Sequence, residues 1–171
     1  EDIINGRHFS NFPQKTSGIH LNGIMQVDSK LKKDETLVLK RYLYPSVDKP
    51  FAIETFVFFN KDIKPVKLEM EYAFREMKTD TSRSVDGPHS FICKTINSGL
   101  QWVQPGDSVS YSVEYQAVKN GSKEKQVNVV AEELARKSRV HELSSLLQLQ
   151  TPDTVLNTAF SFAMLRATES I

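Results

Sequence analysis

The sequence has little of three features that would each assign a class of function. It has one cysteine, Cys93, which excludes an internal disulfide framework and a multi-cysteine zinc site. It has no excess of one charge, because 22 Lys and Arg residues oppose 21 Asp and Glu residues, and a formal charge of +1 attracts neither nucleic acid nor an anionic membrane. It also lacks the run of roughly twenty apolar residues that a membrane span requires. We therefore expect no nucleic-acid partner and no membrane span, and we interpret Cys93 as a small buried residue on a strand.

Motifs for catalysis and metal binding are missing as well. The histidines follow no metal-ligand spacing; they are His8, His20, His89 and His141. Residues 80–86 lack the spacing of an EF-hand, and there is no nucleophile elbow or phosphate-binding glycine loop. Glu54 is the one acid within an otherwise apolar strand, but a lysine or backbone donors would equally satisfy it there. We predict no catalytic residue, no metal and no cofactor in this chain.

Residues 18–130 show the alternation of apolar and polar side chains that is typical of short antiparallel strands. Val66, Leu68 and Met70, followed by Tyr72 and Phe74, alternate with charged residues and predict a strand with one face in water. The run 51–59 is apolar on both sides, which places it near the middle of a sheet. The other predicted strands are 18–21, 24–27, 37–44, 91–96, 97–103, 109–117 and 125–130, with turns at Asn22-Gly23, Gln104–Asp107 and Asn120-Gly121 and a long polar loop at 77–89. This spacing favours an antiparallel β-sandwich over a closed barrel.

The apolar period changes near residue 131 to that of a helix. At 100° per residue, the apolar residues fall into two groups on nearly opposite sides of the helix, and the apolar stripe changes side near Lys137. The first group is Val130, Ala131, Leu134 and Ala135, and the second is Val140, Leu143, Leu146 and Leu147. The pattern predicts one helix that packs on two bodies in turn, or two helices separated by a break; two short helices on one core are the alternative.

The last stretch, 151–171, predicts a helix that is apolar on more than one side. Thr151 suits the cap, Pro152 the first helical position, and Asp153 the positive end of the helix dipole. One neighbouring surface cannot bury two sides, so we expect this helix to belong to a larger helical body of a longer protein. The chain then divides into a mainly β sandwich domain, 1–130, and a region, 131–171, that holds the linker helix and the start of a helical domain.

This order of parts resembles the domain joint of six-hairpin, (α/α)6-barrel glycoside hydrolases and phosphorylases. In those proteins an N-terminal β-sandwich is followed by linker helices, and the first barrel helix begins after a Thr-Pro-Asp-like cap. The residues that carry the likeness are Arg136, Arg139, Leu143, Leu146, Leu147, Thr151, Pro152, Asp153, Leu156, Asn157, Phe160, Phe162 and Ala163. Many members carry tryptophan where this chain has Phe160 and Phe162, so the subfamily and the sugar are left open.

The resemblance implies a non-catalytic N-terminal sandwich domain of a carbohydrate-active enzyme, which supports the catalytic barrel and borders its substrate site. The implied partners are the chain's own C-terminal helical domain and an oligosaccharide. Sugar-binding modules use exposed aromatic rings, so the candidates are Trp102, Tyr42 and Tyr44. A lone tryptophan in a sandwich is more often part of the core, and the two tyrosines would cover either a sugar or the neighbouring helix.

The alternative is a free-standing binding or adhesion module of immunoglobulin-like type. Such a module would dock its helix fully on its own sandwich. The compartment is left open: Glu1-Asp2-Ile3 does not look like a native start, a removed leader peptide would explain it, and a secreted or periplasmic location is favoured.

Overall fold

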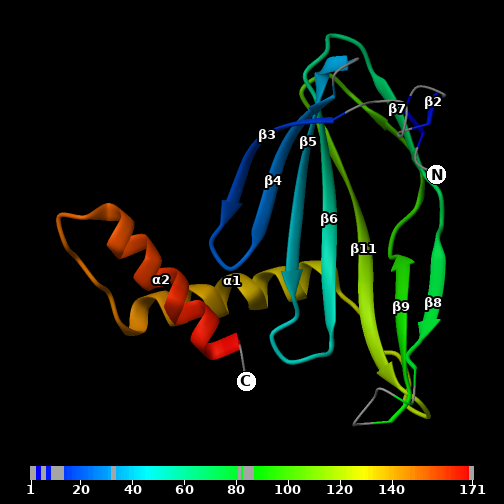
Figure 1. The fold of residues 1–171 in the computed structure, drawn as a ribbon. Coiled ribbons are helices and arrows are strands. Elements are labelled where there is room, and N and C mark those ends of the chain that lie inside the picture. The colour runs from blue at the N-terminus through cyan, green and yellow to red at the C-terminus, as the bar shows by residue number, and fades with distance from the viewer. Residues whose placement is uncertain are drawn as a thin grey trace.

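The fold is mainly β, with two antiparallel sheets followed by two helices (Figure 1). The computed structural model describes residues 3–4, 7–8, 14–31, 34–80, 82 and 87–169. The strands are β1 (Ile3–Ile4), β2 (Arg7–His8), β3 (Gln14–Leu21), β4 (Met25–Leu31), β5 (Asp34–Pro45), β6 (Phe51–Asn60), β7 (Val66–Met70), β8 (Phe74–Lys78), β9 (His89–Thr95), β10 (Gly99–Val103) and β11 (Ser108–Lys119). The helices are α1 (Val129–Leu146) and α2 (Thr154–Glu169).

The two sheets pack face to face around one apolar core. The larger sheet has the order β3-β4-β5-β6-β11-β9-β8 and the smaller one β10-β7-β1-β2. Buried residues of both sheets form the core: Leu31, Leu37, Leu39, Phe58 and Tyr111 from the larger, and Val66, Leu68, Met70 and Val103 from the smaller. The Tyr111 hydroxyl also joins the sheets, at 3.2 Å from the Leu68 carbonyl oxygen and 3.3 Å from that of Gly99. The predicted β-sandwich is therefore confirmed.

The central strand β6 is covered on both faces over part of its length, as predicted from its apolar run. Phe58 points into the core between the sheets, while Phe51 and Ile53 point to the opposite face. On that face they pack with Tyr44, and the ring of Tyr44 lies beneath the start of α1. Because side chains alternate along a strand, β6 joins the sandwich core to the helical region.

One predicted strand ends early because the chain changes sheets. The expected strand 66–74 stops at Met70, and Tyr72 and Phe74 are exposed rather than directed inward. Two hydrogen bonds hold Ala73 to Thr95. The Thr95 backbone N–H donates to the Ala73 carbonyl oxygen at 2.9 Å, and the Ala73 N–H donates to the Thr95 hydroxyl oxygen at 3.0 Å. β7 belongs to the smaller sheet and β8 to the larger, so the alternation breaks at this crossing. β8 also uses residues that were predicted as loop, and residues 81 and 83–86 of that loop lie outside the described residues.

The predicted return strand 125–130 is wrong. The Gln116 side chain takes the place of a strand partner, because its amide donates to the Lys125 carbonyl oxygen at 3.1 Å and accepts from the Lys125 N–H at 2.6 Å. Asn128 then caps a helix: its side-chain oxygen accepts from the Ala131 N–H at 3.1 Å. The chain therefore leaves the sheet after β11 and enters α1 directly.

α1 lies across one end of the larger sheet, and α2 folds back along α1 beyond the β3 edge (Figure 1). α1 is continuous through Lys137, so a break at that position is excluded. α2 begins two residues later than predicted. Asp153, not Thr151, is its cap, since its carboxylate accepts from the N–H groups of Val155 and Leu156 at 2.9 and 3.3 Å.

The face of α1 that docks on the sandwich is largely polar. Its buried residues are Glu132, Arg136 and Leu143, whereas Val130 and Leu134 of the first predicted apolar stripe are exposed. Glu132 accepts from the Ser46 hydroxyl at 2.7 Å and from the Lys49 ammonium, both near the β5–β6 turn. Arg136 donates from Nε to the Gly23 carbonyl oxygen at 2.9 Å, in the β3–β4 turn. Two hairpin turns therefore fix the position of α1.

Substitution of Gly23 by alanine is expected to loosen this attachment. Gly23 has φ +88°, and an added Cβ would overlap Cγ2 of Val140 on α1. Gly121→Ala is the matched control, because Gly121 has φ +82° and open space around it. In both variants the free energy of unfolding should fall by about 1–2 kcal/mol, because alanine is strained in the left-handed backbone conformation. Overpacking should cost Gly23→Ala roughly a further 1–3 kcal/mol, measured by urea unfolding. Equal losses in the two variants would contradict the contact.

Candidate ligand-binding cavity

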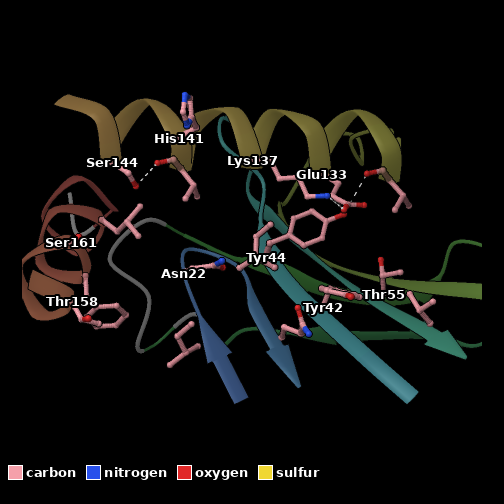
Figure 2. A pocket seen from close by; sticks show the side chains of 18 of the residues that line it. Asn22, Tyr42, Tyr44, Thr55, Glu133, Lys137, His141, Ser144, Thr158 and Ser161 are labelled. Carbon is pink, nitrogen blue, oxygen red and sulfur yellow. Dashed lines mark hydrogen bonds and ion pairs between the residues drawn. The ribbon is translucent and has the colours of Figure 1, made fainter. Parts of the chain in front are cut away.

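A cavity of about 1570 Å³ lies between the larger sheet and the two helices (Figure 2). The face of the sheet that points away from the sandwich core forms its floor. α1 forms the roof, α2 forms one end, and the β3–β4 turn forms part of the rim. The cavity exists because α1 touches the sheet at its turns and strand ends, which leaves the middle of the sheet face uncovered.

The floor carries aromatic, aliphatic and hydroxyl side chains in rows across three strands. In register, Tyr42 of β5 lies opposite Thr55 of β6. Ser110 and Ser108 of β11 lie opposite Val57 and Phe59 of β6. Neighbouring strands are about 4.8 Å apart, so these side chains form one continuous surface. The surface offers rings and hydroxyl groups together. Lys40 of β5 borders it: its ammonium lies 5.7 Å from the centroid of the Phe59 ring, and it is in register with Asp28 of β4.

The roof comes from one stripe of α1. Glu133, Lys137, His141 and Ser144 recur at helical spacing and line the cavity. Lys137 donates to Glu133, so these two charges compensate each other at the surface. The Ser144 hydroxyl donates to the carbonyl oxygen of Val140 at 2.8 Å. The roof is therefore polar, and its Glu133 and Lys137 charges are paired.

The end of the cavity is the apolar side of α2. Val155, Phe162 and Leu165 line it together with Thr158. Leu165 is buried, but the exposed fractions of Val155 and Phe162 are 76% and 42%. This side of α2 faces open space above the sheet and leaves apolar surface available to a ligand.

The three residues predicted to bind sugar lie in three different environments. Tyr42 lines the cavity, half-buried, on its floor. Tyr44 is 1% exposed, and its hydroxyl donates to the Val129 carbonyl oxygen at 3.3 Å, so it covers the helix. Trp102 is 60% exposed on β10, in register with Lys67 of β7, and belongs to the smaller sheet. Tyr42 and Tyr44 thus share a strand face as predicted, but Trp102 does not share it.

Glu54, the one acid considered for catalysis, is held by structural donors. It is buried on the face of the sheet opposite the cavity, where its carboxylate accepts from Arg41 Nε and from the Tyr115 hydroxyl, each at 2.8 Å. Burial, and then this hydrogen bond to Glu54, raises the pKa of Tyr115. On the neighbouring strand, burial raises the pKa of the Cys93 thiol. The arrangement fixes the carboxylate within the fold.

Two general features bear on the kind of site. Among the described residues, no group of three or more His, Cys, Asp or Glu side chains is placed to hold a metal ion. Neither α1 nor α2, over the residues described, is both long and apolar enough to cross a membrane.

Sequence reasoning missed the serines of the floor and the helix residues of the roof. Ser108 and Ser110 alternate with Val109 and Tyr111, and such serines normally face water. The helical spacing of Glu133, Lys137 and His141 is visible in the sequence, but the surface that this stripe faces depends on the two distant turns that hold α1. No local signal specifies that contact.

Stability is expected to fall at high pH through Tyr44. Burial, and then the charge of Glu133, raises the pKa of Tyr44 from 10.0 to about 12. Because the folded state holds the Tyr44 proton more tightly than the unfolded state, Tyr44 contributes to stability, and this contribution is complete below pH 10. It is lost as the pH rises toward 12. Two pKa units correspond to up to roughly 3 kcal/mol. Urea unfolding between pH 9 and 12 should show a smaller fall for Tyr44→Phe than for the unchanged chain.

Tyr115→Phe should also reduce the fall, because the pKa of Tyr115 is raised as well. Tyr72→Phe, at an exposed ring, is the control. A fall in stability that is identical in all three variants and the unchanged chain would exclude Tyr44 as its source.

Comparison with known proteins provides no assignment: no protein-family model matches the chain, and a search of curated proteins found no match. The resemblance to six-hairpin glycoside hydrolases and phosphorylases stays a prediction.

Proposed function

We propose that this chain is the non-catalytic N-terminal sandwich of a carbohydrate-active enzyme, in which it packs against a helical catalytic body and borders the substrate site. The observation that carries the proposal is the second apolar side of α2. Leu156 is 50% exposed, and it lies on the side of the helix away from the cavity residues Thr158 and Leu165. A surface helix normally has one apolar face, and that face packs on its own protein.

Three leucines of α1 and its C-terminal end are exposed as well. Leu134 on α1, and Leu146 and Leu147 at its end, have exposed fractions of 60%, 66% and 58%. Large exposed apolar patches on soluble proteins mark sites of interaction. In this proposal the joint between the sandwich and the helical domain buries the Leu156 side of α2, and the exposed leucines of α1 offer further apolar surface near it.

The chemistry fits a supporting role. Glycoside hydrolysis requires two carboxyl groups on opposite sides of the scissile bond. Three carboxylates are buried among the described residues, and each has a structural partner. Glu54 is engaged by Arg41 and Tyr115, and Glu132 by Ser46 and Lys49. Glu114 pairs with the Lys94 ammonium at 2.9 Å, so none of the three is free to form such a catalytic pair. In this proposal the helical body supplies the catalytic carboxyl groups, and the sandwich holds that body in place.

The exposed helices argue against the alternative, a free-standing module of immunoglobulin-like type. Such a module would bury its helix on its own sheets. Here the one buried apolar residue of α1 is Leu143, which follows the polar contacts of Glu132 and Arg136 along the helix. Leu165 is the one buried apolar residue of α2 among those described.

Leu156→Asp tests the proposal by comparing two lengths of chain. In the 171-residue chain the substitution should change the free energy of unfolding by less than about 0.5 kcal/mol, because Leu156 contacts little. In the complete polypeptide, extended beyond Ile171 as encoded, it should cost roughly 2–4 kcal/mol, because a charge would be buried in an apolar interface. Ile63→Asp, at a residue that is 87% exposed, is the matched control and should be nearly neutral in both.

Activity gives the second measurement. The complete polypeptide should cleave an oligosaccharide by hydrolysis or phosphorolysis, and the 171-residue chain alone should not. A complete polypeptide that ends without a helical domain, or in which Leu156→Asp is as neutral as Ile63→Asp, would overturn the proposal.

A further inference from the structure

We propose that the cavity between the larger sheet and the helices binds a linear, neutral oligosaccharide, with the Tyr42 ring as its platform. The choice of carbohydrate rests on the proposed function, while the location and the neutrality of the ligand come from the cavity itself. The site differs from the apolar surface around Leu156, which is assigned to the helical body.

The size of the cavity favours a chain of several units. Pockets for drug-sized ligands measure roughly 300–1,000 Å³. At about 1570 Å³, the space above the sheet exceeds that range. Its floor extends across strands β4, β5, β6 and β11, from Gln26 to Ser108, so a ligand would lie along a surface rather than in a closed pocket.

The charges favour a neutral ligand. Glu133 and Lys137 are the acidic and basic residues that line the cavity, and they pair with each other. His141 adds an imidazole to the roof, and Tyr42 and Tyr44 add phenol groups to the floor. Lys40 borders the floor over the Phe59 ring, but Asp28 lies in register with it on β4, so this pair adds no net charge. A phosphorylated or uronic ligand would therefore meet no net positive charge, and the site should discriminate against it.

The hydroxyl groups favour a sugar over an alkyl chain. The side chains of Tyr42, Ser108, Ser110 and Asn22 line the cavity and make no hydrogen bond to another described residue. An alkyl chain on this floor would remove water from these groups without replacing their hydrogen bonds, which is costly. A sugar replaces the hydrogen bonds with its own hydroxyl groups.

The apolar groups supply the rest of the contact. Tyr42 lies on the floor beside Thr55 (Figure 2). Val57 and Phe59 follow Thr55 on the same face of β6, and Phe162 lines the cavity from α2. Rings present apolar faces on which the C–H face of a pyranose can pack, while the Tyr42 hydroxyl remains a polar handle. Rings and hydroxyl groups on one surface without net charge are the combination that a sugar chain matches.

The test is calorimetric titration of the 171-residue chain with neutral hexasaccharides: an α-glucan, a β-glucan, a β-mannan and a xylan. At least one should bind. Tyr42→Ala should weaken that binding roughly tenfold, and Tyr42→Phe, which keeps the ring, should weaken it far less. Ser110→Trp, which fills the floor beside Val57, should abolish it. Urea unfolding of each variant establishes that the fold is retained.

Trp102→Ala is the matched control for an exposed aromatic residue on the other sheet. Binding that is lost in Trp102→Ala and kept in Tyr42→Ala and Ser110→Trp would overturn the cavity assignment. Tighter binding of decanoate or of an oligogalacturonate than of every neutral hexasaccharide, or no binding of any of them, would overturn it as well. None of these results alters the outcome of Leu156→Asp, so this inference and the proposed function can fail separately.

Discussion

The attachment of α1 to two hairpin turns is the contact on which the helical half of the structure depends. Glu132 is held by Ser46 and Lys49, and Arg136 is held by the Gly23 carbonyl group. These are directional contacts with buried charged groups, so they fix where the helix lies more narrowly than apolar packing would. Removing either partner would leave a buried charge without compensation, which is strongly unfavourable.

The same attachment creates the cavity. A helix with a broad apolar stripe would lie flat on the sheet and close the space above Val57 and Phe59. α1 instead contacts the turns and the cluster of Tyr44, Phe51 and Ile53, and presents Glu133, Lys137 and His141 to the open part of the sheet. The polar docking face and the uncovered sheet face are therefore two results of one arrangement.

Most of the sandwich could be predicted, because alternation and turn residues are local signals. The hairpin at Asn22-Gly23, the central place of β6 and the edge strand β10 follow from short stretches of sequence. The failures involve distant partners: Thr95 holds Ala73 at the crossing between sheets, and Gln116 replaces a strand at Lys125. The same holds for the cavity. The strand pattern alone places Tyr42 and Tyr44 on one face, whereas the position of the α1 residues above that face depends on contacts far along the chain.

The long separation of the α1 contacts also has a consequence for how the chain folds. Arg136 and Gly23 are 113 positions apart, and Glu132 and Ser46 are 86 apart. Contacts between such distant residues form slowly, because the intervening chain must first be ordered. During synthesis both turns emerge long before the helix, so the apolar cluster of Tyr44, Phe51 and Ile53 stays open to solvent until α1 arrives. That interval is when a nascent chain would be most prone to aggregate and most dependent on a chaperone.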